Sequence, residues 1–299
     1  MVHELKRLLP GVKVSFLASR NIKNLLNGYT DIDNLYFIED HSASLKNFFK
    51  SNNFDAVVHV YPRMNIALAA FTAGVPVRVG TAYRSYSFLF NRKVKEHRKD
   101  SIKHEADYNL NLLDFLGKEI SHNKVFKFKY SAEEENALRR KLKGPLPIDG
   151  KFVIIHPGSK QSSVDLPIGK MLELTGYIVS KYPGYKIAVT GTETERGTSH
   201  RFVQSYGDKV AYITGMLTLR EMLILIDKSS LLIANSTGPI HIAGALNKNI
   251  IGFYPNSAPM TPVRWRPLSE NAVIVTPESG DDMNTITLEQ MKEAIDKFL

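Results

Sequence analysis

The chain contains no cysteine among its 299 residues, which excludes disulfide bonds and thiolate metal sites. It also lacks any apolar run that approaches the roughly 18 residues needed to span a bilayer as a helix. The first residues do not form the charged-then-apolar pattern of a secretory signal. Since a cysteine-free chain suits a reducing compartment, these absences favour a cytoplasmic protein.

Two common catalytic patterns are missing as well. No His/Glu pair stands at the helical spacing of a metalloprotease, and no Gly-x-Ser-x-Gly turn is present. The sequence therefore predicts neither a metallohydrolase nor a serine hydrolase, and we expect no metal-binding residues.

Acidic side chains are in the minority, because 30 Asp and Glu residues face 39 Lys and Arg residues and leave a net charge of +9. A basic stretch attracts phosphorylated substrates, anionic lipid or nucleic acid, and a solvated lysine-rich loop is the alternative. No nucleic-acid-binding motif accompanies it, so we expect no nucleic-acid partner and keep peripheral contact with the inner face of a membrane as a hypothesis. The crowded basic residues are Arg84, Arg92, Lys93, Lys95, Arg98, Lys99 and Lys103.

Short β-rich runs alternate with longer amphipathic runs along the chain. Strands that alternate with helices predict an α/β protein with parallel sheets, and nearly unbroken apolar strands predict sheets covered on both faces. The expected strands are 12–17, 34–38, 56–60, 152–156, 186–190, 210–213, 231–234, 250–254 and 272–275. The expected helices are 22–27, 45–51, 65–73, 104–116, 132–142, 168–181, 219–227, 238–246 and 288–298.

The length favours two domains, and residues 144–150 are the clearest linker because prolines and glycines there oppose regular structure. We expect an N-terminal domain over 1–143 and a C-terminal domain over 151–299, with a cleft between them. The last helix is a candidate to pack back on the N-terminal domain. Residues 2–9 read as the end of a helix, so the strand that usually opens such a domain is missing.

The strongest local signal follows the buried strand 231–234. A short polar turn leads into a helix with Pro239 in its first turn, and Ser236 or Thr237 can cap that helix. The helix N-terminus points free N–H groups at the carboxyl edge of the sheet, where open α/β sheets bind ligands. A phosphate fits there with His241 as an extra donor, and a plain capped helix with a packed histidine is the alternative.

Two further loops follow strands of the same expected sheet, and together with the 235–241 turn they point to a nucleotide more strongly than any one of them does. Small and hydroxyl residues at 157–163 allow close approach to an anion, although the spacing is not that of a P-loop. Acidic residues at 190–196 can accept ribose hydroxyls or complement a helix dipole. The loop 264–268 carries Trp265 between two arginines and serves equally well as a structural anchor.

These loops together resemble glycosyltransferase family 9, the bacterial ADP-heptose:lipopolysaccharide heptosyltransferases. The C-terminal half carries the resemblance best, in segments 156–159, 215–221, 235–241 and 264–268. Segments 54–59, 74–80 and 104–105 of the N-terminal half follow in the family's order. The resemblance therefore covers nearly the whole chain.

The resemblance implies a GT-B fold of two Rossmann-like domains, and inverting transfer of a sugar from a nucleotide sugar, such as ADP-heptose, to an anionic core-oligosaccharide or glycolipid acceptor. It implies no cofactor and no required metal. Residues carried over by position would bind the donor diphosphate, the ribose and base, or the acceptor. For the diphosphate they are Gly158, Ser159, Lys160, Ser236, Thr237, Gly238 and His241; for the ribose and base, Glu195 and Leu217; for the acceptor, Arg63.

This sequence departs from the family's pattern in three places. Ser236 stands where the family has an acid, and residues 164–167 lack the Lys and Trp of the family's Lys-x-Trp-Pro run. The family's first strand and its glycine loop, with the Asp proposed as general base, would precede Met1. The catalytic base is therefore unassigned, and Asp55 and His59 are better explained as structural residues.

Two other functions stay open on the sequence alone. A non-catalytic sugar-nucleotide-binding protein would keep the fold without the base that inverting transfer needs. A GT-B-like epimerase would release an epimerised sugar nucleotide with no acceptor present.

Overall fold

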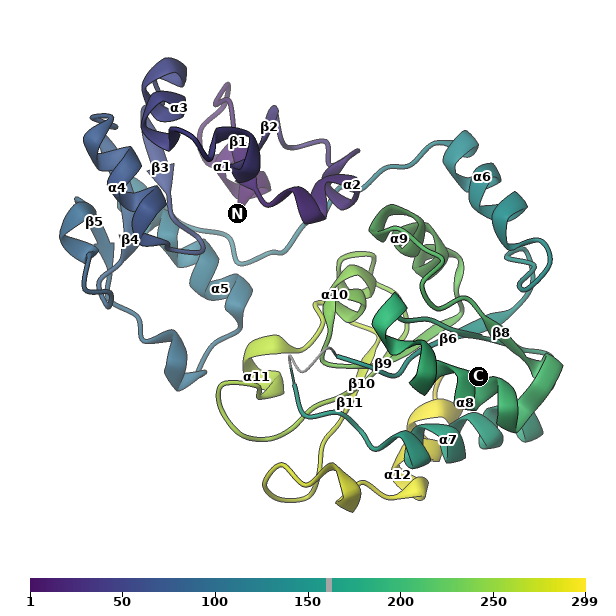
Figure 1. Ribbon diagram of the computed structural model, residues 1–299. Coiled ribbons are helices and arrows are strands. Elements are labelled where there is room, and N and C mark those ends of the chain that lie inside the picture. The colour runs from purple at the N-terminus through teal and green to yellow at the C-terminus, as the bar shows by residue number, and fades with distance from the viewer. Residues whose placement is uncertain (160–162) are drawn as a thin grey trace. The chain divides into compact units, whose positions relative to one another are not determined.

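The computed structural model describes residues 1–159 and 163–299 (Figure 1). The chain divides into two compact units, Met1–Lys127 and Phe128–Leu299, which are described separately below. Within the described residues, no helix is both long and apolar enough to cross a membrane.

The first unit contains two small parallel sheets. One has the strand order β1-β2 and the other β3-β4-β5, and neighbouring strands run parallel in both. The strands are β1 (Ser15–Ala18), β2 (Asn34–Phe37), β3 (Ala56–Val58), β4 (Val77–Thr81) and β5 (Arg92–Val94). The helices are α1 (Val2–Leu8), α2 (Lys23–Leu26), α3 (Leu45–Asn52), α4 (Met64–Thr72) and α5 (Glu105–Leu110), which continues as the 3-10 turn η5 (Asn111–Leu116).

Two kinds of contact hold this unit together. Helices α3 and α4 pack on each other through a small core around Phe48, Phe49 and Ala70. Helix α1 is anchored by the buried Glu4, whose carboxylate accepts hydrogen bonds from Arg7 at 2.6 and 2.9 Å and from the backbone N–H of Ser121 at 2.7 Å.

The second unit is built on a six-stranded parallel sheet with the order β11-β10-β9-β6-β7-β8. The chain enters at β6, builds outward to β8, and returns to add β9 on the other side of β6. The strand order therefore reverses between β6 and β9. The strands are β6 (Phe152–His156), β7 (Lys186–Val189), β8 (Val210–Tyr212), β9 (Leu231–Asn235), β10 (Ile250–Phe253) and β11 (Ala272–Val275).

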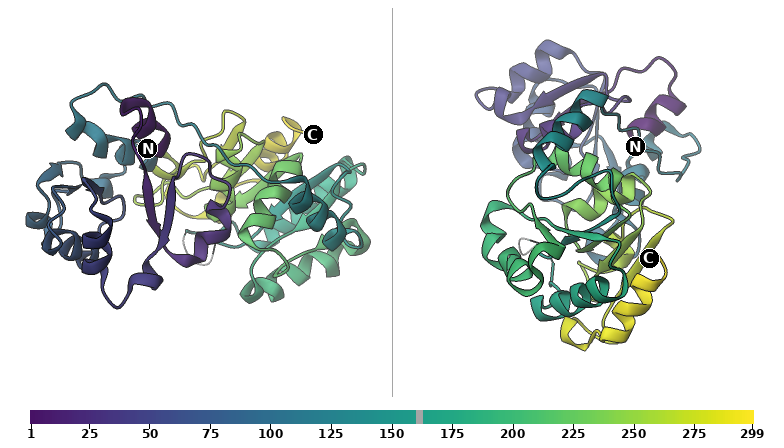
Figure 2. Two further views of the ribbon diagram at one scale, coloured as in Figure 1. Left: turned by 90° about the horizontal axis from the view of Figure 1, so that it is seen from above. Right: turned by 90° about the vertical axis from the view of Figure 1, so that its right-hand side faces the viewer.

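Helices cover both faces of this sheet, which explains why every residue of β6 and β9 is buried. Helix α7 packs against α8 and α12, and the yellow α12 lies beside α7 in Figure 2. On the other face α9 packs against α6 and α10. These helices are α6 (Ala132–Leu142), α7 (Ile168–Lys181), α8 (Arg196–Tyr206), α9 (Leu219–Lys228), α10 (Gly238–Ala245), the short α11 (Pro262–Trp265) and α12 (Leu288–Asp296).

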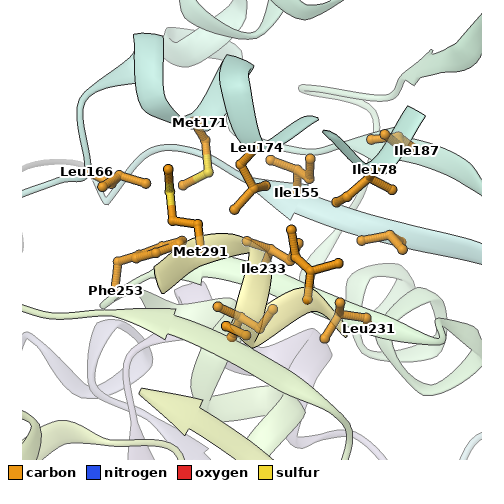
Figure 3. Close-up of a cluster of buried hydrophobic side chains, with 14 of the residues drawn as sticks. Ile155, Leu166, Met171, Leu174, Ile178, Ile187, Leu231, Ile233, Phe253 and Met291 are labelled. Carbon is orange, nitrogen blue, oxygen red and sulfur yellow. The ribbon is translucent and has the colours of Figure 1, made fainter. Parts of the chain in front are cut away.

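The main core of the second unit lies between β6, β9 and the helices α7 and α12. Ile155 and Ile233 from the two central strands meet Met171, Leu174 and Met291 from these helices (Figure 3). The last helix, a candidate to pack on the N-terminal domain, thus buries its apolar face in the core of its own unit.

The second unit begins before the linker predicted at 144–150. Helix α6, placed by the sequence in the first domain, is fixed to α9 by polar contacts. Arg220 donates to Glu134 at 2.8 Å, Lys141 pairs with Glu221 at 2.8 Å, and α6 packs directly on α9. Proline and glycine content marks a break in regular structure at 144–150, but these contacts place α6 with the second unit.

The structure confirms the predicted α/β class, and each predicted strand is present within a few residues of its expected bounds. It adds β4 and β5, which the sequence reading omitted. Gly74 and Pro76 precede β4 and Gly80 lies within it, and β5 lies inside the basic stretch that resembles a solvated loop. Helix α8 was also omitted, because its sequence is polar and includes Gly197, both of which lower helix propensity.

Candidate functional site

The candidate site lies where the strand order of the six-stranded sheet reverses. The loops that leave the carboxyl ends of β6 and β9 flank this point, which is the position where open α/β sheets bind ligands. One fully buried side chain joins the two loops: Asn235 donates to the carbonyl of Pro157 at 2.6 Å and accepts from the backbone N–H of Leu166 at 2.9 Å. Asn235 therefore fixes the spacing of the loops.

The N-terminus of α10 opens at this edge. Thr237 is the N-cap residue with extended backbone dihedrals, and Pro239 sits in the first turn. Among the described residues, the Thr237 hydroxyl accepts no capping hydrogen bond from α10, so the capping role expected for Thr237 is not observed. Gly238 is exposed. The positive end of α10 is thus accessible to an external anion.

An aromatic segment packs beside this helix end. His241, exposed in the first turn of α10, meets the ring of Trp265 edge-on at 6.2 Å. The indole nitrogen of Trp265 donates to the carbonyl of Pro259 at 2.9 Å. A side chain on Gly244 would lie 2.7 Å from the backbone nitrogen of Leu268, so α10 and the 264–268 segment approach too closely for any larger residue.

Cations and a buried phenol complete this end of the site. The Arg264 guanidinium lies over the Trp265 ring at 4.8 Å. Tyr254 is fully buried, donates to the carbonyl of Trp265 at 3.0 Å, and forms a side-chain hydrogen bond with Ser236. Burial raises the pKa of Tyr254, so it stays a neutral hydrogen-bonding group, and Arg266 adds positive charge nearby.

The loop after β7 brings Glu195 against the loop after β6. The Glu195 carboxylate accepts from the backbone N–H and the hydroxyl of Thr192, both at 2.7 Å, and closes a capping box. Its other oxygen would lie 1.8 Å from a Cβ at residue 158, so a side chain at Gly158 would have to displace the Glu195 carboxylate. The predicted ribose-binding and diphosphate-binding residues are therefore neighbours, and Glu195 also serves the local fold.

The loop after β8 carries the half-buried Leu217 next to the start of α9. Thr218 and Glu221 form a reciprocal capping box there, with bonds of 2.8 and 3.2 Å. The capping box gives a structural reason for a hydroxyl residue at 218 and an acidic residue at 221 within segment 215–221. Gly215 has φ +76°, and a side chain on it would meet Glu193 of the neighbouring loop at 2.4 Å.

Ser159 differs from the expectation of an open phosphate ligand. It is 3% exposed, and its backbone N–H donates to Asp165 at 3.2 Å. Burial raises the pKa of Asp165, and the nearby Glu195 charge raises it further. A carboxylate thus accepts the backbone N–H of Ser159, a residue that the family resemblance assigns to the donor diphosphate. Lys160, the expected positive partner, lies outside the described residues.

Arg63 belongs to the first unit. It is the exposed N-cap residue of α4, just beyond the carboxyl end of β3, and its guanidinium lies over the Tyr61 ring at 5.1 Å. His59 is buried against Phe90, and burial lowers its pKa to about 4, which keeps the imidazole neutral. Within the described part of the chain, no three His, Asp or Glu side chains gather as a metal site.

Sequence reasoning missed the parts of the site that hold it together. The sequence places Asn235 in a motif and Tyr254 in a loop without indicating that either joins distant segments. In the structure Asn235 bonds to Pro157 and Tyr254 bonds to Trp265. The available signal was a polar residue at the end of a wholly apolar strand, because a buried amide must find partners.

Two α/β units with parallel sheets, the second with a reversal in its strand order, have the architecture of the GT-B fold. The model of glycosyltransferase family 9 (heptosyltransferase) matches residues 42–293. The chain therefore belongs to this family of glycosyltransferases.

Individual relatives agree with this family. A Haemophilus influenzae relative is 26% identical over 231 residues, which make up 74% of this chain and 66% of that protein. Lipopolysaccharide heptosyltransferase 3 of Escherichia coli is 23% identical over 287 residues, 91% of this chain and 82% of the relative. The structure of E. coli ADP-heptose lps heptosyltransferase II superposes with a TM-score of 0.80 at 17% identity, over 99% of this chain and 92% of that one.

Proposed function

We propose that this chain transfers a heptose or similar sugar from a nucleoside diphosphate donor to an anionic acceptor of the lipopolysaccharide-core type. Family membership supports sugar transfer, and relatives named as heptosyltransferases support this sugar and acceptor. The proposed place of action is the cytoplasmic side of a membrane.

The observation that carries the donor half of this proposal is the open N-terminus of α10. Among the described residues, the side chain of the N-cap residue Thr237 makes no capping hydrogen bond to an N–H group of α10. The next residue, Gly238, is exposed. A diphosphate bound there would face the positive helix end, with His241 as an added donor. Glu195 and Leu217 lie on the loops after β7 and β8, where we place the ribose and the base.

The proposed chemistry needs little more from the second unit than stabilisation of the leaving group. The acceptor hydroxyl oxygen forms a bond to the anomeric carbon, and the bond from that carbon to the diphosphate breaks. Negative charge then builds on the diphosphate, which the helix end and its neighbouring cations stabilise. The hydroxyl proton goes to a base that we leave unassigned. Arg63 is the residue that we propose for the anionic acceptor.

The test compares two N-cap substitutions of the same kind. Thr237→Asp places a carboxylate where the diphosphate would bind, because aspartate caps helix N–H groups well. We propose that no metal is required, so the assay contains EDTA. We expect ADP or UDP to raise the melting temperature of the wild type and to bind the variant about tenfold more weakly. Thr287→Asp, at the hydroxyl-capped start of α12, is the control and should bind nucleotide normally.

Equal affinity of Thr237→Asp and the wild type would remove α10 from the donor site. A wild type that responds to no nucleoside diphosphate would overturn the donor proposal. An epimerised sugar nucleotide released without acceptor would replace transfer with the epimerase reaction.

A further inference from the structure

Helix α4 of the first unit presents three large apolar side chains outward, whereas Ile66 packs against the small core around Phe48. Met64, Leu68 and Phe71 are spaced at i, i+4 and i+7 on one face and are 60%, 47% and 46% exposed. The inward face carries the alanines Ala67 and Ala70, which are buried. A helix on a water-exposed surface normally has the opposite arrangement, with its large apolar residues inside.

Two aromatic residues extend this face. Tyr61, just before α4, and Phe88, on the 3-10 turn η3 (Ser87–Leu89) that packs on α4, are each 72% exposed. Arg78 connects the two elements, because its guanidinium lies over the Phe71 ring at 5.2 Å and donates to the carbonyl of Leu89 at 2.9 Å. We call Tyr61, Met64, Leu68, Phe71 and Phe88 the α4 surface.

The segment that carries the α4 surface has charged residues of one sign only. Residues 56–95 contain no aspartate or glutamate, whereas they contain the basic residues Arg63, Arg78, Arg84, Arg92, Lys93 and Lys95. Arg63 and Arg78 lie directly over Tyr61 and Phe71. Long cationic side chains beside exposed apolar ones suit a boundary between hydrocarbon and anionic headgroups.

We propose that the α4 surface docks the first unit on an anionic lipid bilayer, with the apolar side chains in the headgroup boundary and the arginines on lipid phosphates. This inference rests on the proposed function in so far as a glycolipid acceptor lies in a membrane. A second copy of the chain is a poorer occupant, because a symmetric contact would bring the two basic surfaces together.

The experiment sediments the full chain with vesicles of phosphatidylglycerol and phosphatidylcholine, and with phosphatidylcholine vesicles alone. We expect binding to the anionic vesicles, weakened by salt. Phe88→Ser should lower the partition about tenfold, since it removes one large side chain from the boundary. Arg84→Gln should lower it about fivefold. Val263→Ser removes a side chain that is 52% exposed in the second unit and should change nothing.

Nucleotide binding, measured without vesicles, separates this inference from the proposed function. Membrane docking would be overturned if the wild type failed to bind anionic vesicles, or if Phe88→Ser bound them equally well. A normal response to ADP in the same experiment would leave the donor-site proposal intact. Vesicle binding without any response to nucleotide would support membrane docking and overturn the donor-site proposal. A wild type that dimerises without lipid, with Phe88→Ser monomeric, would assign the surface to a second copy.

Discussion

The two units of this protein differ in how far they bury their apolar residues. The second unit buries its apolar residues around one six-stranded sheet that is covered on both faces. The polar residues of its candidate site lie at the carboxyl edge of that sheet. The first unit divides its strands between two small sheets and leaves Met64, Leu68 and Phe71 exposed. This difference is consistent with the two proposals made above, which place a small ligand on the second unit and a membrane surface on the first.

The comparison also separates the two kinds of positive charge. In the second unit positive potential comes from an ordered helix end with a few cations held by aromatic rings, such as Arg264 over Trp265. In the first unit it comes from a stretch of residues without any acid. A helix end suits one diphosphate, whereas a diffuse basic surface suits many weak phosphate contacts.

The largest expected effect is at Asn235. Asn235→Leu leaves the Pro157 carbonyl and the Leu166 N–H without a buried partner, and we expect a loss of about 3 kcal/mol in the free energy of unfolding of the second unit. Asn34→Leu is the control, because Asn34 is exposed on β2 and bonds only weakly to Ser15 at 3.2 Å. Chemical denaturation should show a change below about 0.5 kcal/mol for the control. Similar losses in both variants would contradict the bridging role of Asn235.

A smaller effect is expected at Gly244. Gly244→Ala forces a methyl group toward the Leu268 backbone, so we expect about 1–3 kcal/mol of destabilisation and weaker ADP binding as the Trp265 segment shifts. Gly169→Ala in α7 meets no atom within 4 Å and should stabilise the protein by about 0.5–1 kcal/mol. Thermal unfolding of both variants measures this contrast. A stabilised Gly244→Ala would show that α10 and the 264–268 segment are not tightly packed.

The last expected effects are in the pH dependence of stability, and they have opposite signs for Glu4 of the first unit and Asp165 of the second. The Arg7 hydrogen bonds lower the pKa of Glu4 from 4.5 to about 2, so its contribution is present above 4.5 and is lost as the pH falls toward 2. Burial raises the pKa of Asp165 above 3.8, so its contribution is present below 3.8 and is lost as the pH rises through the raised value.

Unfolding of Glu4→Gln and Asp165→Asn across this pH range tests both signs. Glu4→Gln should remove the contribution of Glu4 to the acid sensitivity of the first unit, and Asp165→Asn should stabilise the second unit near neutral pH but not below 3.8. Asp165→Asn that weakens the protein at neutral pH would show that its bond to Ser159 outweighs its burial.

Sequence patterns predicted the second unit well because its strands are apolar and its helices begin with local signals. The segment 231–246 shows this: an apolar run, a polar turn and Pro239 are all local features. Contacts between distant segments could not be read this way. The bond from Asn235 to Pro157, the Glu195 carboxylate against Gly158 and the outward face of α4 depend on how separate elements meet.

Amide chemical shifts of the isotope-labelled chain during titration with ADP test the central claim most directly. If the diphosphate binds at α10, the largest changes should be at the N–H groups of Thr237 and Gly238, with the hydroxyl-capped first turn of α12 unaffected. Saturable changes confined to other loops, with Gly238 unmoved, would contradict the assignment of this helix end as the donor site.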